Sequence, residues 1–216
     1  MTITLSSYIT DAQRLLHDAS NRFWSQTELI DYANKARKLI AAETGCTRQV
    51  VNFDIAAATT LAGATYSMDT IIAAPVARRI FDILDILLLY SNNTVYQLRY
   101  LPYSSAVRTG IWQIKYAGTP THYTINNRQV ILLQWPAIAY AGSSIDCLVE
   151  PLDLVDLTDP DTDIAFPYTE CVGFYMAHLA KLKDQRRDEA EAFFKDYQRR
   201  KVQAIGAEFT RRLVNT

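Results

Sequence analysis

Four carboxylates after Pro151 have the spacing of the oxygen ligands in an EF-hand calcium loop: Asp159, Asp161, Asp163 and Glu170. The position where such a loop needs glycine for its sharp turn holds Ile164, and Pro160 and Pro167 stiffen the backbone. We therefore interpret the four side chains as solvated loop acids. Their charge also favours the N-terminus of the helix expected to follow.

Cys171 and His178 are the next candidates for chemistry, because they lie seven residues apart on one face of a predicted helix. Two helical turns, about 10 Å, are too long for the direct contact of a thiolate–imidazole pair. His17 and His122 have no neighbours with the ligand spacing of a zinc site. Because Walker A, GxGxxG, GxSxG and HExxH motifs are also missing, the sequence predicts a non-enzymatic protein without metal or cofactor.

Basic side chains concentrate near the C-terminus, where residues from Lys181 onward include ten basic and six acidic side chains. The candidates for binding are Arg186, Arg187, Lys195, Arg199, Arg200, Lys201, Arg211 and Arg212. Such a segment could dock onto an acidic neighbour or lie near nucleic acid. The alternative is a solvated amphipathic helix whose charges pair internally, as in Glu191–Lys195.

The bulk composition limits the class of protein. A chain of 216 residues with 49% hydrophobic content fits one domain, alone or with an extension. A formal net charge of -1 predicts no bulk attraction to nucleic acid or membrane. Three cysteines without CxxC spacing indicate a reducing compartment, and we expect neither a signal peptide nor a membrane span. Thirteen tyrosines fit either an interaction surface or an aromatic β core.

Two helices are predicted at the N-terminus. The first covers residues 6–19, with Ser6 or Ser7 as its cap. The second covers residues 25–45, where Ser25 and Glu28 form a capping box and Gly45 suits the left-handed end. Phe23, just before the cap, is placed to pack on the first turn of that helix.

Residues 48–150 are rich in Val, Ile, Thr and Tyr and predict a mostly antiparallel β region. We expect strands at Val50–Ile55, Thr65–Met68, Ile80–Leu89, Val95–Leu98, Trp112–Tyr116 and Ile145–Val149, with a short helix in Pro102–Trp112. The segment Ile80–Leu89 would also fit a short helix. If it is a strand, the alternation of side chains places Asp82 and Asp85 on opposite sides.

The clearest hairpin pairs His122–Ile125 with Gln129–Gln134. Its predicted tip is Asn126–Asn127, because asparagine tolerates the positive φ that tight turns require. Arg128 follows directly.

Two further helices are predicted after the β region. Pro167 suits the first position of a helix over residues 167–184, and the polar stretch Lys183–Asp188 bends or interrupts it before a second run from Glu189 to about Arg212. The fold class is therefore α+β, with the terminal helices forming a helical bundle. The expected organisation is a single domain, 1–184, with residues 48–150 inserted as the β region and residues 185–216 as a helical extension.

The ordered set of segments resembles the head-to-tail adaptor (connector) proteins of short-tailed bacteriophages. The likeness begins with FWSQTELIDYANKARKLIAAETG, continues through GTPTHYTINNRQVILLQWP, and ends with VEPLDLVDLTDPDTDIAFP followed by two helices. One departure is the hairpin tip, where the family often has glycine and this chain has Asn126–Asn127.

The resemblance implies a virion protein at the neck between capsid and tail, assembled in the host cytoplasm. Such a protein docks beneath the portal ring and forms a ring, a dodecamer in expectation. The ring extends the channel for DNA ejection without specific base contacts and presents a platform for the tail nozzle. The basic residues of the C-terminal helix would dock on the portal, and Asn126, Asn127 and Arg128 would face the tail.

Two other function classes stay open at this stage. One is a nucleic-acid-binding module that uses the basic C-terminal helix. The other is a hydrolase with an unfamiliar site, although the sequence offers no plausible paired-acid motif. The dependence of DNA affinity on salt would distinguish the first of these from an adaptor.

Overall fold

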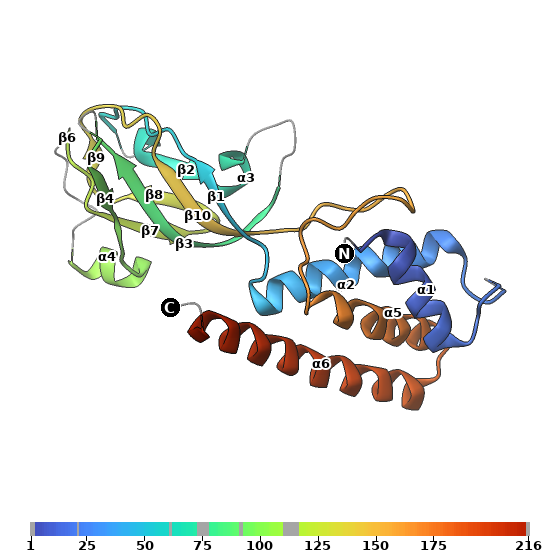
Figure 1. The fold of residues 1–216 in the computed structure, drawn as a ribbon. Helices are drawn as coiled ribbons and strands as arrows, with labels where there is room; N and C mark the ends of the chain where they lie inside the picture. Colours follow the sequence, from blue (N-terminus) through green and yellow to red (C-terminus); the bar gives the residue numbers. More distant parts are fainter. Residues whose placement is uncertain are drawn as a thin grey trace. The chain divides into compact units, whose positions relative to one another are not determined.

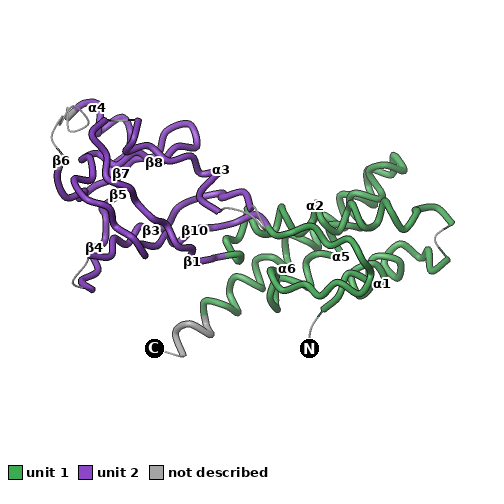
Figure 2. Tube along the Cα trace, turned by 90° about the horizontal axis from the view of Figure 1, so that it is seen from above, with its two compact units in different colours: residues 1–47, 151–216 green, residues 48–150 purple. Residues whose placement is uncertain are grey.

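The computed structural model describes residues 3–20, 22–60, 62–72, 78–90, 93–109 and 117–214, and it has two compact units. Residues 1–47 and 151–216 form a helical unit, and residues 48–150 form a β unit (Figure 2). Helices from both ends of the chain build the first unit, while the strands all lie in the second (Figure 1). The predicted α+β class, with helices at both ends and an antiparallel central sheet, is confirmed.

In the helical unit, α2 (Gln26–Thr44) begins and ends where the sequence predicts. The Ser25 hydroxyl accepts a hydrogen bond from the Glu28 N–H at 3.3 Å, and the Ser25 N–H donates to the Glu28 carboxylate at 3.1 Å. Gly45 follows the helix in the left-handed conformation, with φ of 65°. The capping box and the glycine end are therefore confirmed.

The predicted start of the first helix is wrong, because α1 (Leu5–Leu16) has no side-chain cap. Its first N–H groups are satisfied by a distant backbone segment instead: Leu5 donates to the Asp159 carbonyl at 3.1 Å and Ser6 to the Leu157 carbonyl at 3.0 Å. Ser6 thus lies inside the helix, and a tertiary contact replaces the expected local one.

The residues before α2 also differ from expectation. Phe23 is 76% exposed and does not pack on the first turn of α2, whereas the neighbouring Trp24 is only 6% exposed. The Lys181 ammonium lies 5.7 Å from the Trp24 ring centre. Because Trp24 has the larger apolar surface, its burial in place of Phe23 is the more favourable arrangement.

At the other end of the unit, α5 (Thr169–Lys183) and α6 (Arg187–Val214) pack side by side (Figure 1). The predicted interruption between them is confirmed, since Gln185 has φ of 60°. Pro167 is not the first helical residue as predicted: it lies in a turn closed by the Tyr168 N–H and the Ala165 carbonyl at 3.0 Å, and α5 begins at Thr169.

A buried ion pair joins these elements. The Arg37 guanidinium donates two hydrogen bonds to the Asp161 carboxylate, both at 2.8 Å, and the two side chains are 1% and 0% exposed. The Tyr8 hydroxyl donates to the same carboxylate at 2.8 Å. Tyr8 belongs to α1, Arg37 to α2 and Asp161 to the segment before α5, so one carboxylate fixes three parts of the unit.

The β unit contains two four-stranded sheets and a small third pair. The first sheet is antiparallel, in the order β1 (Arg48–Asn52), β10 (Ser144–Val149), β3 (Ile80–Leu89) and β4 (Val95–Gln97). The second has the order β2 (Thr65–Ser67), β8 (Gln129–Leu132), β7 (His122–Asn126) and β5 (Arg99–Tyr100), with β5 parallel to β7. The remaining elements are β6 (Ala117–Gly118) beside β9 (Trp135–Pro136), η1 (Ala62–Ala64), α3 (Met68–Ile71) and α4 (Tyr103–Thr109).

Both sheets contribute to one core, which contains Ile83, Ile86 and Ile145 from the first sheet and Val130 and Leu132 from the second. The strand interpretation of Ile80–Leu89 is confirmed and the short-helix alternative is wrong. Tyrosine contributes to the cores of both units through the buried Tyr8, Tyr123, Tyr140 and Tyr197, while Tyr96 and Tyr100 are about half exposed. The alternative of a tyrosine-rich interaction surface stays a prediction.

Strand boundaries shift in several places. The first strand ends at Asn52, and Ile55 only bridges Tyr140. Met68 opens the short helix α3, because the Ser67 hydroxyl accepts from the Asp69 N–H and starts a helical turn. The strand predicted at Trp112–Tyr116 lies outside the described residues, as does the end of the helix predicted in Pro102–Trp112.

The hairpin of β7 and β8 is confirmed, but its tip lies one residue later than predicted. Asn126 pairs with Gln129 inside the ladder. The turn is made by Asn127, with φ of 47°, and Arg128, with φ of 61°. Two positive φ angles define the tight turn that fits the twist of a hairpin, so the ladder gains one more pair.

A β-bulge changes which side of β3 its aspartates face. Cys147 pairs with Ile83 and Asp146 pairs with Asp85, so Leu84 is an extra residue without a partner. The bulge shifts the alternation: Asp82 pairs with Leu148 and Asp85 with Asp146, two residues apart on β10, so the two aspartates face the same side of the sheet. The expectation that the two aspartates lie on opposite sides of a strand is therefore wrong.

Replacing Asp161 by Asn tests the buried ion pair. Removing one partner of such a pair leaves the other charge buried without compensation, so we expect Asp161→Asn to lower the free energy of unfolding by about 3 kcal/mol in urea denaturation. Asp31→Asn is the matched control, because the Lys35–Asp31 pair is 58% and 57% exposed. That control should change stability by less than about 0.5 kcal/mol. Equal losses of unfolding free energy in the two variants would show that the buried pair stabilises the protein no more than an exposed one.

The same pair gives a pH dependence. Burial alone would raise the pKa of Asp161, but the hydrogen bonds and charge of Arg37 outweigh it and hold the pKa below its ordinary value of 3.8. A depressed folded-state pKa stabilises the protein above the ordinary value, and this contribution disappears as pH falls below it. The difference in unfolding free energy between wild type and Asp161→Asn should therefore narrow below about pH 4, as urea denaturation at several pH values would measure. A difference that is constant with pH would contradict this.

Candidate interaction surfaces

The carboxylates with calcium-loop spacing each have a structural partner. The Asp159 carboxylate accepts from the Val155 and Asp156 N–H groups, both at 2.8 Å. Asp161 is held by Arg37, and the Asp163 carboxylate accepts from the Leu152 N–H at 2.9 Å. Glu170, the last of the set, pairs with Arg200 of α6 at 3.1 Å. These side chains thus order a segment that has no helix or strand of its own.

The other candidates for chemistry are one cysteine and three histidines. Within the residues that the structure describes, no group of three or more His, Cys, Asp or Glu side chains is placed to hold a metal ion. Cys171 is fully buried, which raises the pKa of its thiol to about 11, and His178 directs Nδ1 at the Ala190 carbonyl, 2.8 Å away. His122 contacts the Thr121 hydroxyl through Nδ1 at 3.0 Å, and His17 ends α1 in the left-handed conformation.

The basic residues expected to dock on a partner are mostly engaged in ion pairs near the start of α6. Arg186 pairs with Asp184 at 2.9 Å and with Glu189 at 3.2 Å. Lys195 pairs with Glu191 at 3.0 Å, and Arg199 pairs with Asp196 at 2.9 Å. Side chains three or four positions apart are neighbours on a helix, so these pairs are local and solvent-exposed. The intrahelical alternative describes them well.

Further along α6, basic and aromatic side chains attach the helix to the rest of its unit. Lys201 pairs with Glu43 of α2 at 2.9 Å, and the hydroxyl of the buried Tyr197 donates to the same carboxylate. Arg200 pairs with Glu170 of α5. Glu208 accepts from the Tyr168 hydroxyl. Much of the positive charge of this segment is therefore neutralised inside the helical unit.

The remaining three predicted docking residues differ from these. Arg187 is exposed, and within the part of the chain that the structure describes it has no ion-pair partner. Arg211 and Arg212 continue the backbone of α6, but their side chains are outside the described part. Of the six predicted docking residues whose side chains are described, all except Arg187 are engaged in ion pairs within the helical unit.

The predicted tail-facing hairpin is tied to its own unit. The Arg128 guanidinium donates from Nε to the Asp69 carboxylate at 3.1 Å and from Nη1 to the Ile80 carbonyl at 3.2 Å. The Arg128 carbonyl accepts from the Met68 N–H at 2.9 Å. Of the three predicted contact residues, Asn127 is exposed, while Asn126 and Arg128 are partly buried.

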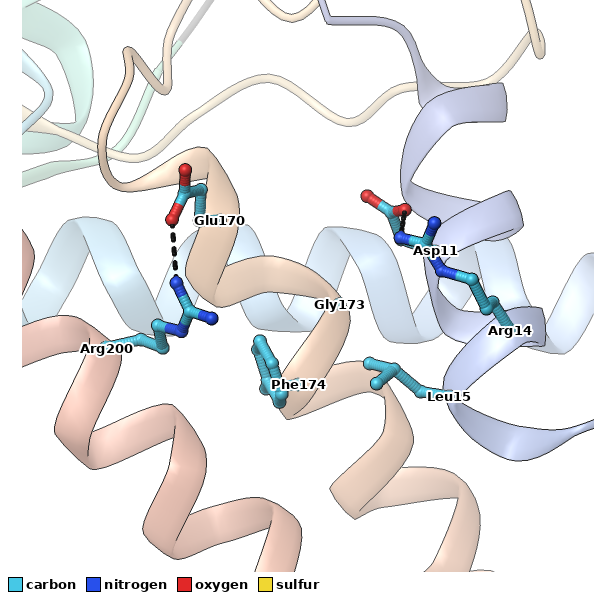
Figure 3. Close-up of a pocket in the computed structure, with 7 residues that line it drawn as sticks. All are labelled: Asp11, Arg14, Leu15, Glu170, Gly173, Phe174 and Arg200. Atoms are coloured by element: carbon cyan, nitrogen blue, oxygen red, sulfur yellow. Dashed lines mark hydrogen bonds and ion pairs between the residues drawn. The ribbon is translucent and has the colours of Figure 1, made fainter.

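The sequence analysis missed a groove on the helical unit (Figure 3). It has a volume of about 290 Å³ and is lined by Asp11, Arg14 and Leu15 of α1, Glu170, Gly173 and Phe174 of α5, and Arg200 of α6. A β-carbon on Gly173 would meet the Asp11 β-carbon at 3.5 Å, an ordinary van der Waals distance, so α1 and α5 lie side by side at the groove. No local pattern in the sequence indicated the groove, because α1 is distant in sequence from α5 and α6.

The groove has an apolar floor and a charged rim. Leu15 and Phe174 are partly exposed at its floor (Figure 3). Arg14 pairs with Asp11 at 2.7 Å on one side, and Arg200 pairs with Glu170 on the other. The Arg200 guanidinium also lies 5.5 Å from the Phe174 ring centre. An apolar centre with a polar rim is the arrangement found in protein–protein contacts.

Along α6, three apolar residues form an exposed row that we call the outer stripe: Val202, Ile205 and Phe209. They are 65%, 42% and 64% exposed. Their spacing places them on one side of the helix. Since contiguous exposed apolar side chains mark interaction surfaces more often than isolated ones do, the outer stripe is a candidate contact.

The β unit has a second hollow at the end of its sheets, with a volume of about 550 Å³. It is lined by Leu84, Asp85, Tyr96, Gln97, Leu98, Arg99, Tyr100 and Tyr123. Burial, followed by the charges of Asp85 and Asp82, raises the pKa of Tyr123 to about 12. The Asp85 carboxylate accepts from the Ile86 N–H at 2.8 Å and from Gln97 at 2.7 Å. Because the Asp85 carboxylate already accepts these two hydrogen bonds, it suits binding or positioning of a partner better than acid–base chemistry.

Glu43→Gln tests how α6 is held. The change removes the charge that Lys201 and the Tyr197 hydroxyl share, so we expect a loss of about 1–3 kcal/mol in stability and faster amide exchange in the C-terminal half of α6. Glu191→Gln is the matched control, because the Lys195–Glu191 pair is 74% and 65% exposed. It should change stability by less than about 0.5 kcal/mol. Unchanged exchange in Glu43→Gln would show that α6 is held by its apolar contacts alone.

Neither known protein families nor curated proteins offer a relative. No family model matches the chain, and no curated protein matches it significantly. The resemblance to head-to-tail adaptors therefore stays a prediction, and function is inferred from the chain's own residues and surfaces.

Proposed function

We propose that this chain is a structural head-to-tail adaptor of a short-tailed phage virion. It binds the portal ring, extends the DNA channel below it and provides the attachment platform for the tail. It acts as one subunit of a ring, for which we expect twelve subunits, and performs no catalysis. Its place is the neck of the virion, between capsid and tail.

The observation that carries the proposal is the presence of apolar contact surfaces on a well-packed chain. The outer stripe leaves Val202 and Phe209 about two-thirds exposed, and the groove of the helical unit has an apolar floor. Surfaces with an apolar centre and a charged rim suit a protein that works by contacting other proteins. The order of segments, helices on both sides of a β unit, also fits the resemblance.

The distribution of charge supports passage of DNA better than tight binding of DNA. Lys201 and Arg200 pair with carboxylates of α2 and α5, so these cations are not available to phosphates without breaking a contact. The chain as a whole has a formal net charge of -1. Because affinity for duplex DNA rises with the number of phosphates neutralised, such a chain should bind DNA weakly. This disfavours the nucleic-acid-binding alternative.

Mixing the full chain with the portal ring encoded by the same genome tests the proposal. We expect native mass spectrometry to show a stable complex in which several copies of the chain occupy one portal ring. A chain that stays free at micromolar concentrations of both components would overturn the adaptor function.

DNA binding provides the accompanying control. In fluorescence anisotropy with a random duplex, we expect weak association that falls steeply as salt is raised. A submicromolar dissociation constant at physiological salt would favour the nucleic-acid-binding module instead, because nonspecific binding is typically about 10⁻⁴–10⁻⁶ M under those conditions.

A further inference from the structure

Within the helical unit, the groove and the outer stripe lie on opposite sides of α6. Arg200 forms one wall of the groove, and Phe209 ends the outer stripe. These residues are nine positions apart, which is about two and a half helical turns, so their side chains leave the helix in opposite directions. Val202 and Ile205 lie close to the direction of Phe209.

We infer that the outer stripe of one copy of this chain packs into the groove of a second copy. The inference deepens the proposed function, because it assigns the subunit contact that a ring of adaptors requires. The two surfaces are unlike and face opposite ways, so a pair of copies cannot exchange both contacts about a two-fold axis. The contact is therefore head-to-tail, and repeated head-to-tail contacts close into a ring when their rotation allows it.

The chemistry of the two surfaces is complementary. Leu15 and Phe174 form an apolar floor, which matches the aliphatic and aromatic side chains of the outer stripe. Burying Phe209 there removes apolar surface from water on both partners, which is the main favourable contribution to such a contact.

The charged rims also match. At one end of the outer stripe, the exposed Arg199 pairs with Asp196 at 2.9 Å. At the rim of the groove, Arg14 pairs with Asp11 at 2.7 Å, and these two side chains are 79% and 54% exposed. Each surface thus has one cation and one anion that can exchange partners across the contact without leaving a charge unpaired. Rim pairs of this kind fix orientation more than they add affinity.

Two single variants separate the surfaces. Phe209→Glu places a charge on the outer stripe and leaves the groove intact, whereas Leu15→Glu places a charge in the groove and leaves the stripe intact. The matched controls are Gln203→Glu on α6 and Ser6→Glu on α1, since both side chains are exposed and point away from the outer stripe and from Leu15 respectively.

Sedimentation velocity of the full chain over a concentration series measures the contact. We expect wild type and both controls to form species larger than the monomer as concentration rises. Each surface variant alone should associate at least about tenfold more weakly, because a carboxylate would have to be buried in an apolar contact. An equal mixture of Phe209→Glu and Leu15→Glu should form a heterodimer and nothing larger, since only one intact stripe and one intact groove remain per pair.

Several outcomes would overturn the inference. Wild type that stays monomeric at the highest concentration, or a mixture of variants that forms no heterodimer, excludes the head-to-tail contact. A large loss of thermal stability in monomeric Phe209→Glu shows that the stripe is covered by the chain itself. If wild type binds the portal but neither variant changes self-association, the adaptor function stands and this contact is excluded. Self-association of wild type that both variants weaken, without binding to the portal, would leave this contact standing and overturn the adaptor function.

Discussion

The buried ion pair between Arg37 and Asp161 is the contact on which the helical unit depends. Two charged groups that are almost fully buried are tolerated only when their hydrogen-bonding capacity is met, and here it is. Both Asp161 oxygens accept from Arg37, and further donors are the Tyr8 hydroxyl and the N–H groups of Asp163 and Ile164. Losing either charged partner would leave the other charge unpaired in the interior, so the pair enforces one arrangement of its surroundings.

This arrangement extends from the ion pair to the candidate surfaces. Fixing Asp161 also fixes the segment before it, whose Leu157 and Asp159 carbonyls receive the first N–H groups of α1. The position of α1 in turn sets one wall of the groove, through Asp11 and Leu15. The groove is thus a consequence of a buried charge that does not touch it. A segment without helix or strand can have this influence because its carbonyls accept from α1 and its carboxylates accept from Arg37 and from backbone N–H groups.

The sequence predicted the features that depend on interactions between residues close together in the chain, such as helix ends and a hairpin. The capping box at Ser25 and the glycine at the end of α2 are recognised within a few residues, and the hairpin of β7 and β8 follows from two strand-like runs and a turn. The one-residue error at the hairpin tip arose because two successive positive φ angles fall on Asn127 and Arg128, and arginine gives no hint of such a conformation.

Contacts distant in sequence could not be predicted. Arg37 and Asp161 are 124 positions apart, and nothing in either local pattern indicates a partner. The sequence analysis therefore interpreted the acids of the segment before α5 as solvated. That interpretation is wrong for Asp161, which is buried and pairs with an arginine. The missing side-chain cap of α1 has the same origin. The groove forms where α1 packs beside α5 and α6, which are distant from it in the sequence, so no local pattern could have indicated it.

The two sides of α6 explain why charge alone is a poor guide to the function of this chain. One side buries Ala190, Tyr197 and Ala204, which recur every seven residues, and anchors the helix through ion pairs beside them. Basic residues on that side stabilise the unit and are poorly available to a partner. The opposite side carries the outer stripe, whose exposed apolar atoms have no role in the isolated helical unit. Since exposed apolar surface is unfavourable in water, its placement opposite the anchored side is better explained by contact with another protein than by the packing of this one.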